Sequence, residues 1–144
     1  MPMSDSQTTV ADLKRLVATF VDERDWQQFH APKNLAMSIA IESAELMEHF
    51  QWISVEESLR RVQQEDVREE IAEELADVLC YCLALTNAME LDLAAAIQAK
   101  MEKNRRKYPA ETFRGRYGHD DPALPKFSDE SSSDESSSGG SPGQ

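Results

Sequence analysis

Glycine and proline are almost absent from the body of this chain. All five glycines follow Arg114, and no proline occurs between Pro32 and Pro109. These two residues are the strongest breakers of regular structure, so the 76 residues from 33 to 108 can form long, uninterrupted helices. Their absence also excludes a glycine-rich phosphate-binding loop from this part of the chain. A phosphate-binding site here must therefore use metal ions and cationic side chains.

Cysteines, basic residues and long apolar runs are also scarce. Cys80 and Cys82 lie two apart on a predicted helix, point to nearly opposite sides and cannot bond to each other, so we expect a reducing, cytoplasmic compartment. The longest unbroken apolar run, Val78–Leu85, is far too short to cross a bilayer, and we expect no membrane partner. The formal net charge of −12 argues against binding long nucleic acid. A small polyanion that arrives with its own divalent cations remains compatible with this charge.

The end of the chain differs in composition from the rest. Residues 126–144 contribute −3 to the net charge, residues 1–125 contribute the remaining −9, and no apolar residue follows Phe127. Such a segment cannot offset the entropy of ordering. We therefore expect one helical domain over residues 1–125 and a disordered, acidic, serine-rich tail over residues 126–144.

Apolar residues recur at helical spacing through the body and predict an all-α fold with four main helices in a bundle. We expect these helices over about residues 9–26, 34–52, 66–90 and 92–107, with a polar helical stretch over 54–64. Thr9 with Asp12 and, later, Asp92 are the predicted caps. The predicted apolar stripes of the first three main helices comprise Leu13, Leu16, Val17 and Phe20; Leu35, Ile39, Leu46 and Phe50; and Ile71, Leu75, Val78 and Cys82.

One part of the third predicted helix is apolar on every side. Residues 78–85 contain no polar side chain except the Tyr81 hydroxyl and the two thiols. A helix that is hydrophobic all round needs neighbours all round, which a chain of this size would struggle to supply. We therefore expect a homo-oligomer.

Two acidic pairs border the predicted apolar stripes: Glu42 with Glu45, and Glu74 with Asp77. Acids three apart on a helix project from the same face about one turn apart. If the two helices pack side by side, four carboxylates converge, and such a cluster is tolerable only when protons or a cation neutralise it. The sequence therefore predicts a metal site.

Oxygen ligands without sulfur or a convincing imidazole favour Mg²⁺, with Mn²⁺ as a second possibility. The competing di-iron site of helical bundles uses Glu-x-x-His pairs. Here His49 is four residues after Glu45, so that pattern is missing and iron is the weaker hypothesis.

Several motifs together carry a family resemblance. The blocks ESAE and EELAD, the approach RDWQQFHAPKNLA, the following HFQW and the closing KMEKNRRKYP resemble the all-α nucleotide pyrophosphohydrolases of the MazG type, in particular the dCTP pyrophosphatase branch. The resemblance covers about residues 10–110. It implies a helical oligomer, often a tetramer built as a dimer of dimers, that hydrolyses a deoxynucleoside triphosphate to the monophosphate and pyrophosphate. It also implies a role in cleansing the nucleotide pool, with dCTP or a modified dCTP as the preferred substrate.

The resemblance also implies roles for particular residues. Glu42, Glu45, Glu74 and Asp77 would be the metal ligands and catalytic residues. One of these carboxylates could double as general base, a role that the sequence does not separate from ligation, and we choose Glu45 for it. Substrate binding would fall to residues near the base, the sugar and the phosphates: Trp26, His30 and Trp52; Tyr81; and Lys100, Asn104 and Arg105. Val17 stands where vertebrate relatives have a histidine, so the base preference is left open.

Two rival functions remain compatible with the sequence. One is a broader or dUTP-directed nucleotide hydrolase with the same acidic helices. The other is a non-catalytic helical oligomer that binds cations. A panel of nucleotides with Mg²⁺, scored for pyrophosphate, would separate the three hypotheses.

Overall fold

The structure, a computed structural model, describes residues 3–116. Within them the chain is entirely helical, with no strand, which confirms the all-α prediction. The helices are α1 (Val10–Asp22), the 3-10 helix η1 (Gln27–Phe29), α2 (Pro32–Glu48), α3 (Val55–Arg61), α4 (Glu65–Ala88), α5 (Leu93–Lys107) and α6 (Ala110–Phe113). The predicted serine-rich tail lies outside the described residues. The chain forms two compact units, Met1–Ala99 and Lys100–Gln144, and each is described by itself.

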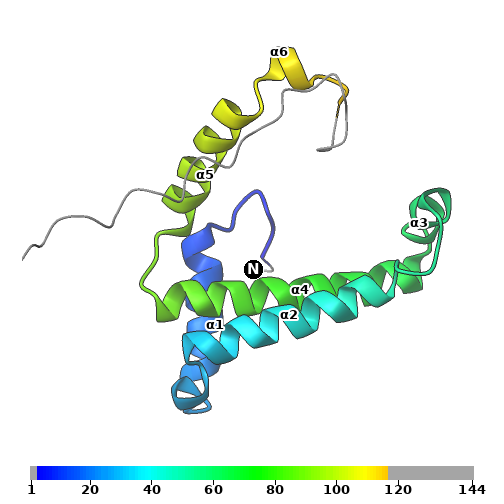
Figure 1. The fold of residues 1–144 in the computed structure, drawn as a ribbon. Coiled ribbons are helices and arrows are strands. Elements are labelled where there is room, and N and C mark those ends of the chain that lie inside the picture. Colours follow the sequence, from blue (N-terminus) through cyan, green and yellow to red (C-terminus); the bar gives the residue numbers. More distant parts are fainter. Residues whose placement is uncertain (1–2, 117–144) are drawn as a thin grey trace, which may run out of the picture. The chain divides into compact units, whose positions relative to one another are not determined.

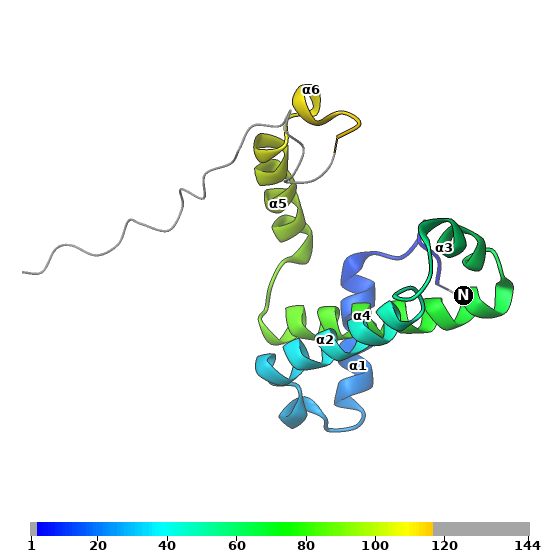
Figure 2. The same ribbon diagram turned by 45° about the vertical axis from the view of Figure 1, so that its right-hand side comes forward.

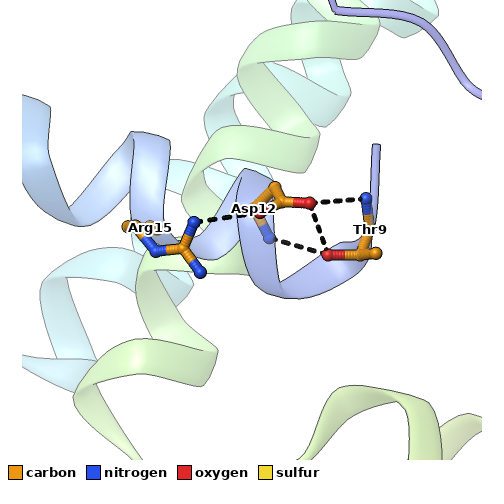
Figure 3. Close-up of polar contacts among 3 residues, drawn as sticks. All are labelled: Thr9, Asp12 and Arg15. Carbon is orange, nitrogen blue, oxygen red and sulfur yellow. Dashed lines mark hydrogen bonds and ion pairs between the residues drawn. The ribbon is translucent and has the colours of Figure 1, made fainter. Parts of the chain in front are cut away.

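Helix α1 begins at the predicted capping box. The backbone N–H of Thr9 donates to Asp12 Oδ2 at 3.0 Å, and the backbone N–H of Asp12 donates to Thr9 Oγ1 at 3.2 Å (Figure 3). Arg15 adds an ion pair to Asp12 Oδ1 at 2.9 Å. The helix ends at Asp22, four residues earlier than the sequence suggested, and Asp25 then adopts the left-handed conformation with φ of 52°. The Trp26–Lys33 segment is consequently free to form η1 and the turn into α2.

Helices α2 and α4 form the centre of the first unit. Pro32 occupies the start of α2, where its missing N–H costs no hydrogen bond, and the chain reverses direction through α3. In both views α2 therefore runs antiparallel beside α4, and α1 lies against the second half of α4 (Figures 1 and 2). This arrangement brings the second half of α2 next to the first half of α4.

The buried core is small and lies where these three helices meet. It contains Val21 from α1, Leu35 from α2, and Leu83 and Ala84 from α4. The buried Thr86 hydroxyl donates to the Leu83 carbonyl at 2.8 Å. Burial of these side chains stabilises the crossing of the three helices, because apolar area removed from water contributes roughly 25 cal/mol per Å².

Two side-chain hydrogen bonds connect α1 to the last turn of α4 and to the turn that follows it. Asn87 Nδ2 donates to the Lys14 carbonyl at 2.9 Å, and Lys14 Nζ donates to the Leu91 carbonyl at 2.8 Å. Beyond this turn, Asp92 Oδ1 accepts the backbone N–H of Ala95 at 3.0 Å, which confirms the predicted cap of α5.

Much of the predicted apolar stripe is exposed in the single chain. Leu13, Leu16 and Phe20 of α1 are 37%, 54% and 49% exposed, and Leu75 of α4 is 46% exposed. The expectation that Leu75 is buried is therefore wrong for one chain, and the apolar face of α1 is exposed as well. The spacing of these residues was read correctly as helical, but spacing alone cannot show whether a neighbour covers a face.

The structure also differs from the sequence expectation in smaller ways. The sequence predicts irregular structure over residues 110–127, but within the described part of that stretch Ala110–Phe113 form the short helix α6. Cys80 and Cys82 are both free thiols, as predicted.

Among the described residues, no single helix has both the length and the hydropathy for a membrane span. Helices α4 and α5 taken together meet these two criteria only as a bent pair.

Candidate active site

Three of the predicted acidic residues converge between α2 and α4. Glu42, Glu45 and Glu74 each offer a carboxylate oxygen, and these atoms lie within 4.8 Å of one another. Glu42 and Glu45 are one turn apart on α2, and Glu74 comes from α4, which packs antiparallel to α2 (Figure 1). Glu42 and Glu74 are half-buried, whereas Glu45 is exposed. We call these three residues the acidic cluster.

Asp77, the fourth predicted ligand, is not a member of the acidic cluster. It lies on α4 about one turn beyond Glu74 and is exposed. Its charge still acts on the cluster, since it contributes to the raised pKa of Glu42. The structure thus brings three of the four predicted ligands together and leaves the fourth within electrostatic range.

The electrostatics of the cluster are unfavourable for charged carboxylates. Burial raises the pKa of Glu42 above its usual range, and the carboxylates of Glu45, Asp77 and Glu74 raise it further. Both effects disfavour the ionised form, one through lost hydration and the other through like-charge repulsion. Burial, assisted by the Asp77 charge, also raises the pKa of the Cys80 thiol. A cation bound at the cluster would reverse these effects on the carboxylates.

A cavity of about 440 Å³ opens beside the cluster. Glu45 and Glu74 line it, together with Glu48, His49 and the half-buried Arg61 of α3. Carboxylates and a guanidinium that line one cavity can hold a divalent cation and an anionic group together. The cavity is therefore suited to a polyphosphate that carries a metal ion.

The donor set fits a hard divalent cation. Mg²⁺ binds oxygen at about 2.0–2.1 Å with octahedral geometry, so two of its ligands lie at most about 4.2 Å apart. The three carboxylate oxygens, within 4.8 Å of one another, need only small side-chain rotations to meet that limit. The remaining coordination positions would be available to water and phosphate oxygens, as is usual for Mg²⁺.

A second cavity, of about 290 Å³, lies near the start of α2 and the end of α4. The sequence-predicted base-binding residue His30 lines it, and α1, η1 and α4 supply the remaining walls. The lining residues are Val17, Ala18, Val21, Asp22, Gln27, His30, Ala84, Asn87 and Ala88. We call this the apolar-floored pocket, because alanine and valine side chains make up most of it.

The other predicted base-binding residues are placed apart from each other. Trp26 directly precedes η1, and its ring packs edge-on against Phe20 with centroids 5.9 Å apart. Trp52 follows α2 and is 86% exposed. Since α2 has 17 residues, its two ends are about 25 Å apart, so one chain does not bring Trp52 to Trp26 and His30. Tyr81 is half-buried on α4, one turn after Asp77.

The predicted phosphate-binding residues lie on α5. Lys100 and Arg105 are exposed and Asn104 is half-buried. All three belong to the second compact unit, Lys100–Gln144. Arg105 is in the last turn of α5, where a cation also complements the helix dipole.

Sequence reasoning missed several polar residues that line the two cavities: Glu48 and Arg61 in the first, and Asp22, Gln27 and Asn87 in the second. Asn87 had a usable signal, because it is a polar residue one turn beyond Ala84 at the apolar end of α4. Arg61 had none, because basic residues are common in a short helix such as α3. Its place beside the acids depends on how the chain turns after α2.

An all-α fold in which two packed helices present converging carboxylates defines a helical protein with a candidate metal centre. The profile of the MazG-like family matches residues 37–117, which is more than half of the chain and includes all four predicted acidic ligands. The chain belongs to the MazG-like family.

Two curated relatives show a similarity that is more specific than membership of the family. The chain is 43% identical over 110 residues to dCTP pyrophosphatase 1 of Bos taurus, covering 76% of this chain and 65% of the relative. It is 43% identical over 108 residues to dCTP pyrophosphatase 1 of Homo sapiens, covering 75% of this chain and 64% of the relative. The matched part therefore spans slightly less than two thirds of the length of these relatives.

A solved structure supports the fold. A pyrophosphatase from Archaeoglobus fulgidus superposes with a TM-score of 0.66 at 41% sequence identity. The match covers 75% of this chain and 99% of that protein. The helical architecture described above is thus shared with a protein of known structure.

Proposed function

We propose that this protein hydrolyses a deoxynucleoside triphosphate, preferentially dCTP or a modified dCTP, to the monophosphate and pyrophosphate in a divalent-metal-dependent reaction. The acidic cluster carries this proposal, because three carboxylate oxygens within 4.8 Å need a cation to offset their repulsion. The dCTP pyrophosphatases that resemble the chain over three quarters of its length support the substrate class. Such an enzyme would cleanse the nucleotide pool.

The proposed metal ion is Mg²⁺, with Mn²⁺ as an alternative, held by Glu42, Glu45 and Glu74 and assisted by Asp77. When bound, such an ion neutralises charge on the phosphates and favours ionisation of water. Glu42 and Glu74 are half-buried, and we assign them to binding the metal ion. The exposed Glu45 lines the cavity and can reach a water molecule there.

The chain's own residues account for the remaining steps of the proposed reaction. Glu45 accepts a proton as water adds to the α-phosphorus, and the bond between that phosphorus and the oxygen bridging to the β-phosphorus breaks. Lys100, Asn104 and Arg105 neutralise and orient the released pyrophosphate. Tyr81, one turn from Asp77, lies against the sugar, where a close wall disfavours a ribose 2′-hydroxyl.

A substrate panel tests this proposal directly. Pyrophosphate release from dCTP should require Mg²⁺, stop on addition of EDTA and resume when Mg²⁺ is restored in excess. The monophosphate should be the other product. Faster turnover of dUTP than of dCTP would favour the broader hydrolase. A folded protein that releases no pyrophosphate from any nucleotide would favour the non-catalytic cation-binding oligomer.

We also propose that the protein is a homo-oligomer, a tetramer built as a dimer of dimers, in which further copies complete the helical bundle. The exposure of Leu16, Phe20 and Leu79, at 54%, 49% and 53%, supports this, because apolar faces of this kind mark interaction surfaces. The placement of Trp52 supports it as well. A base enclosed by Trp26, His30 and Trp52 requires the Trp52 of another copy, since one chain separates them by the length of α2.

Mixing two inactive variants tests the shared site. Trp52→Ala and Glu45→Gln should each have low activity alone, and co-refolded mixtures should regain part of it, because some mixed sites receive both wild-type residues. Each variant co-refolded with itself is the control. No recovery in mixtures that mass measurements show to be hetero-oligomers, or a stable monomer at micromolar concentration, would contradict the proposal.

The reducing, cytoplasmic compartment predicted from the sequence stays a prediction. The unpaired state of Cys80 and Cys82 is compatible with it.

A further inference from the structure

The cavity beside the acidic cluster extends towards the end of the α2–α4 pair where α3 lies. Glu48 and His49 follow Glu45 along α2, which runs antiparallel to α4, so they are displaced from Glu45 towards the start of α4. Figures 1 and 2 show α3 at this same end of the pair. Tyr81 lies in the opposite direction, seven residues beyond Glu74 and about 10 Å further along α4.

Arg61, the last residue of α3, lines this cavity together with three glutamates and His49. It is half-buried, and no ion pair or side-chain hydrogen bond joins its guanidinium to another residue within 3–116. A guanidinium remains charged at physiological pH and presents a planar fork of N–H donors. These donors are therefore available to a ligand in the cavity.

A phosphate group is the anion that suits such a guanidinium, because two parallel N–H groups can donate to two of its oxygens. In the proposed reaction the bond from the α-phosphorus to the bridging oxygen breaks, and its electron pair stays on the departing pyrophosphate. A cation beside the pyrophosphate stabilises this charge as it develops. A nucleotide whose sugar lies against Tyr81 and whose α-phosphate lies at the acidic cluster directs its terminal phosphates towards Arg61.

We propose that Arg61 binds the terminal phosphates of the substrate, which are the portion released as pyrophosphate. This inference rests on the proposed function, because it assumes that the ligand is a nucleoside triphosphate. It adds to Lys100, Asn104 and Arg105 a cation from the same compact unit as the acidic cluster. It also gives the substrate a direction along α4, with the sugar towards Tyr81 and the γ-phosphate towards α3.

Calorimetry with two ligands tests this assignment. Inorganic pyrophosphate with Mg²⁺ represents the terminal phosphates, and dCMP with Mg²⁺ represents the rest of the substrate. Arg61→Gln should raise the Kd of pyrophosphate by about 10- to 100-fold, the range expected for loss of a hydrogen bond to a charged group. The Kd of dCMP should stay within about twofold of the wild-type value. Arg61→Lys keeps the charge without the planar fork, so it should recover part of the affinity for pyrophosphate.

Kinetics provide a second readout. With dCTP as substrate, Arg61→Gln should lower kcat as well as raise KM, because the contact strengthens while charge develops on the leaving group. Added pyrophosphate should inhibit this variant less than it inhibits the wild type.

Arg60→Gln is the matched control. Arg60 is the neighbouring residue on α3, and its substitution removes the same charge, but it is exposed, pairs with Glu57 and does not line the cavity. Loss of this exposed ion pair should change the melting temperature only slightly. The Kd of pyrophosphate should stay within about twofold of the wild-type value. The difference between the two variants therefore separates a direct contact from the effect of net charge.

The inference is overturned if the wild type does not bind pyrophosphate with Mg²⁺, or if Arg61→Gln binds it as Arg60→Gln does. An equal loss of affinity for pyrophosphate and dCMP would also overturn it. A lower metal-free melting temperature with unchanged affinity for pyrophosphate would show instead that Arg61 neutralises the carboxylates. If Arg61→Gln does not fold, Arg61→Lys decides: weaker binding of pyrophosphate alone supports the inference, and wild-type affinity overturns it.

These outcomes are distinct from those of the proposed function. Release of pyrophosphate from dCTP by the wild type would leave the proposed function standing even if Arg61 makes no contact with phosphate. If the wild type hydrolyses no nucleotide, the proposed function fails. Calorimetry with pyrophosphate then still shows whether Arg61 binds phosphate groups, since that measurement requires no turnover.

Discussion

The two halves of the α2–α4 pair have opposite effects on the stability of the fold. Where α2 begins and α4 ends, Leu35, Leu83 and Ala84 are buried, and α1 packs against α4 in the same half. Where α2 ends and α4 begins, Glu42, Glu45 and Glu74 bring like charges together. The first half supplies stability through apolar burial, and the second half costs stability until a cation arrives. One continuous pair of helices thus supports a site that would not hold together by itself.

The largest effect on stability is expected at the apolar half. Leu35 is 2% exposed, so Leu35→Ala should lower the free energy of unfolding by about 2–5 kcal/mol through lost burial and a cavity. Urea denaturation measures this loss. Below its melting temperature the variant should retain pyrophosphate release, because the acidic half is untouched.

Met37→Ala is the comparison for this variant. Met37 lies on the same helix but is 56% exposed, so its truncation should change stability by less than about 0.5 kcal/mol in a single chain. A loss as large as that of Leu35→Ala, growing as the protein is diluted, would instead place Met37 in an interface between copies.

A substitution in the acidic half should affect activity rather than stability. Glu45→Gln should lower kcat by at least about 100-fold, because it removes a charged ligand and the proposed base without changing the shape of the side chain. Its melting temperature without metal should not fall. Glu73→Gln, an exposed neighbour on α4, should leave kcat within about twofold of the wild type. Full activity in Glu45→Gln would show that the acidic half has been assigned wrongly.

Metal binding should reduce the difference in stability between the apolar half and the acidic half of the α2–α4 pair. A ligand that binds only the folded protein stabilises it by about 2.7 kcal/mol at 100 times its dissociation constant. Mg²⁺ at that excess should therefore raise the melting temperature of the wild type, and the increase should be smaller in Glu45→Gln. Equal increases in both proteins would indicate that the ion binds elsewhere.

The smallest expected effect is a pH dependence from Glu42. Because its folded-state pKa is raised above the ordinary value of 4.5, the folded protein binds more protons than the unfolded one just above that pH. Metal-free stability should consequently fall as the pH rises from about 4.5 through the raised pKa. Glu42→Gln should remove this fall and be more stable at neutral pH by about 0.2–0.5 kcal/mol. Urea melts at pH 4 and pH 7 without metal measure the difference, and excess Mg²⁺ should abolish or reverse it.

The sequence predicted the helices better than their ends. The capping box at Thr9 and the cap at Asp92 are where the pattern placed them, since a cap is a local arrangement of four residues. Helix α1 nevertheless ends at Asp22 and α2 at Glu48, each four residues early. No glycine or proline marks these ends, and the hydrophobic pattern continues through them.

The site was predictable in one respect and hidden in another. Acids three apart on two helices identified Glu42, Glu45 and Glu74 as neighbours. The same spacing also predicted Asp77 as a fourth metal ligand, yet Asp77 lies outside the acidic cluster. Which carboxylates meet depends on the register between α2 and α4. The spacing of residues within either helix does not determine that register.

By itself, the sequence determined the helical fold, the positions of the acids along each helix and the exclusion of a glycine-rich phosphate loop. These properties depend on local preferences and on a period of 3.6 residues, which neighbouring residues set. Only the tertiary structure decided that three acids rather than four converge, that Trp52 lies a helix length from His30, and that Asn87 lines a pocket. These properties depend on contacts between residues far apart in the chain, and such contacts are fixed only when the helices pack.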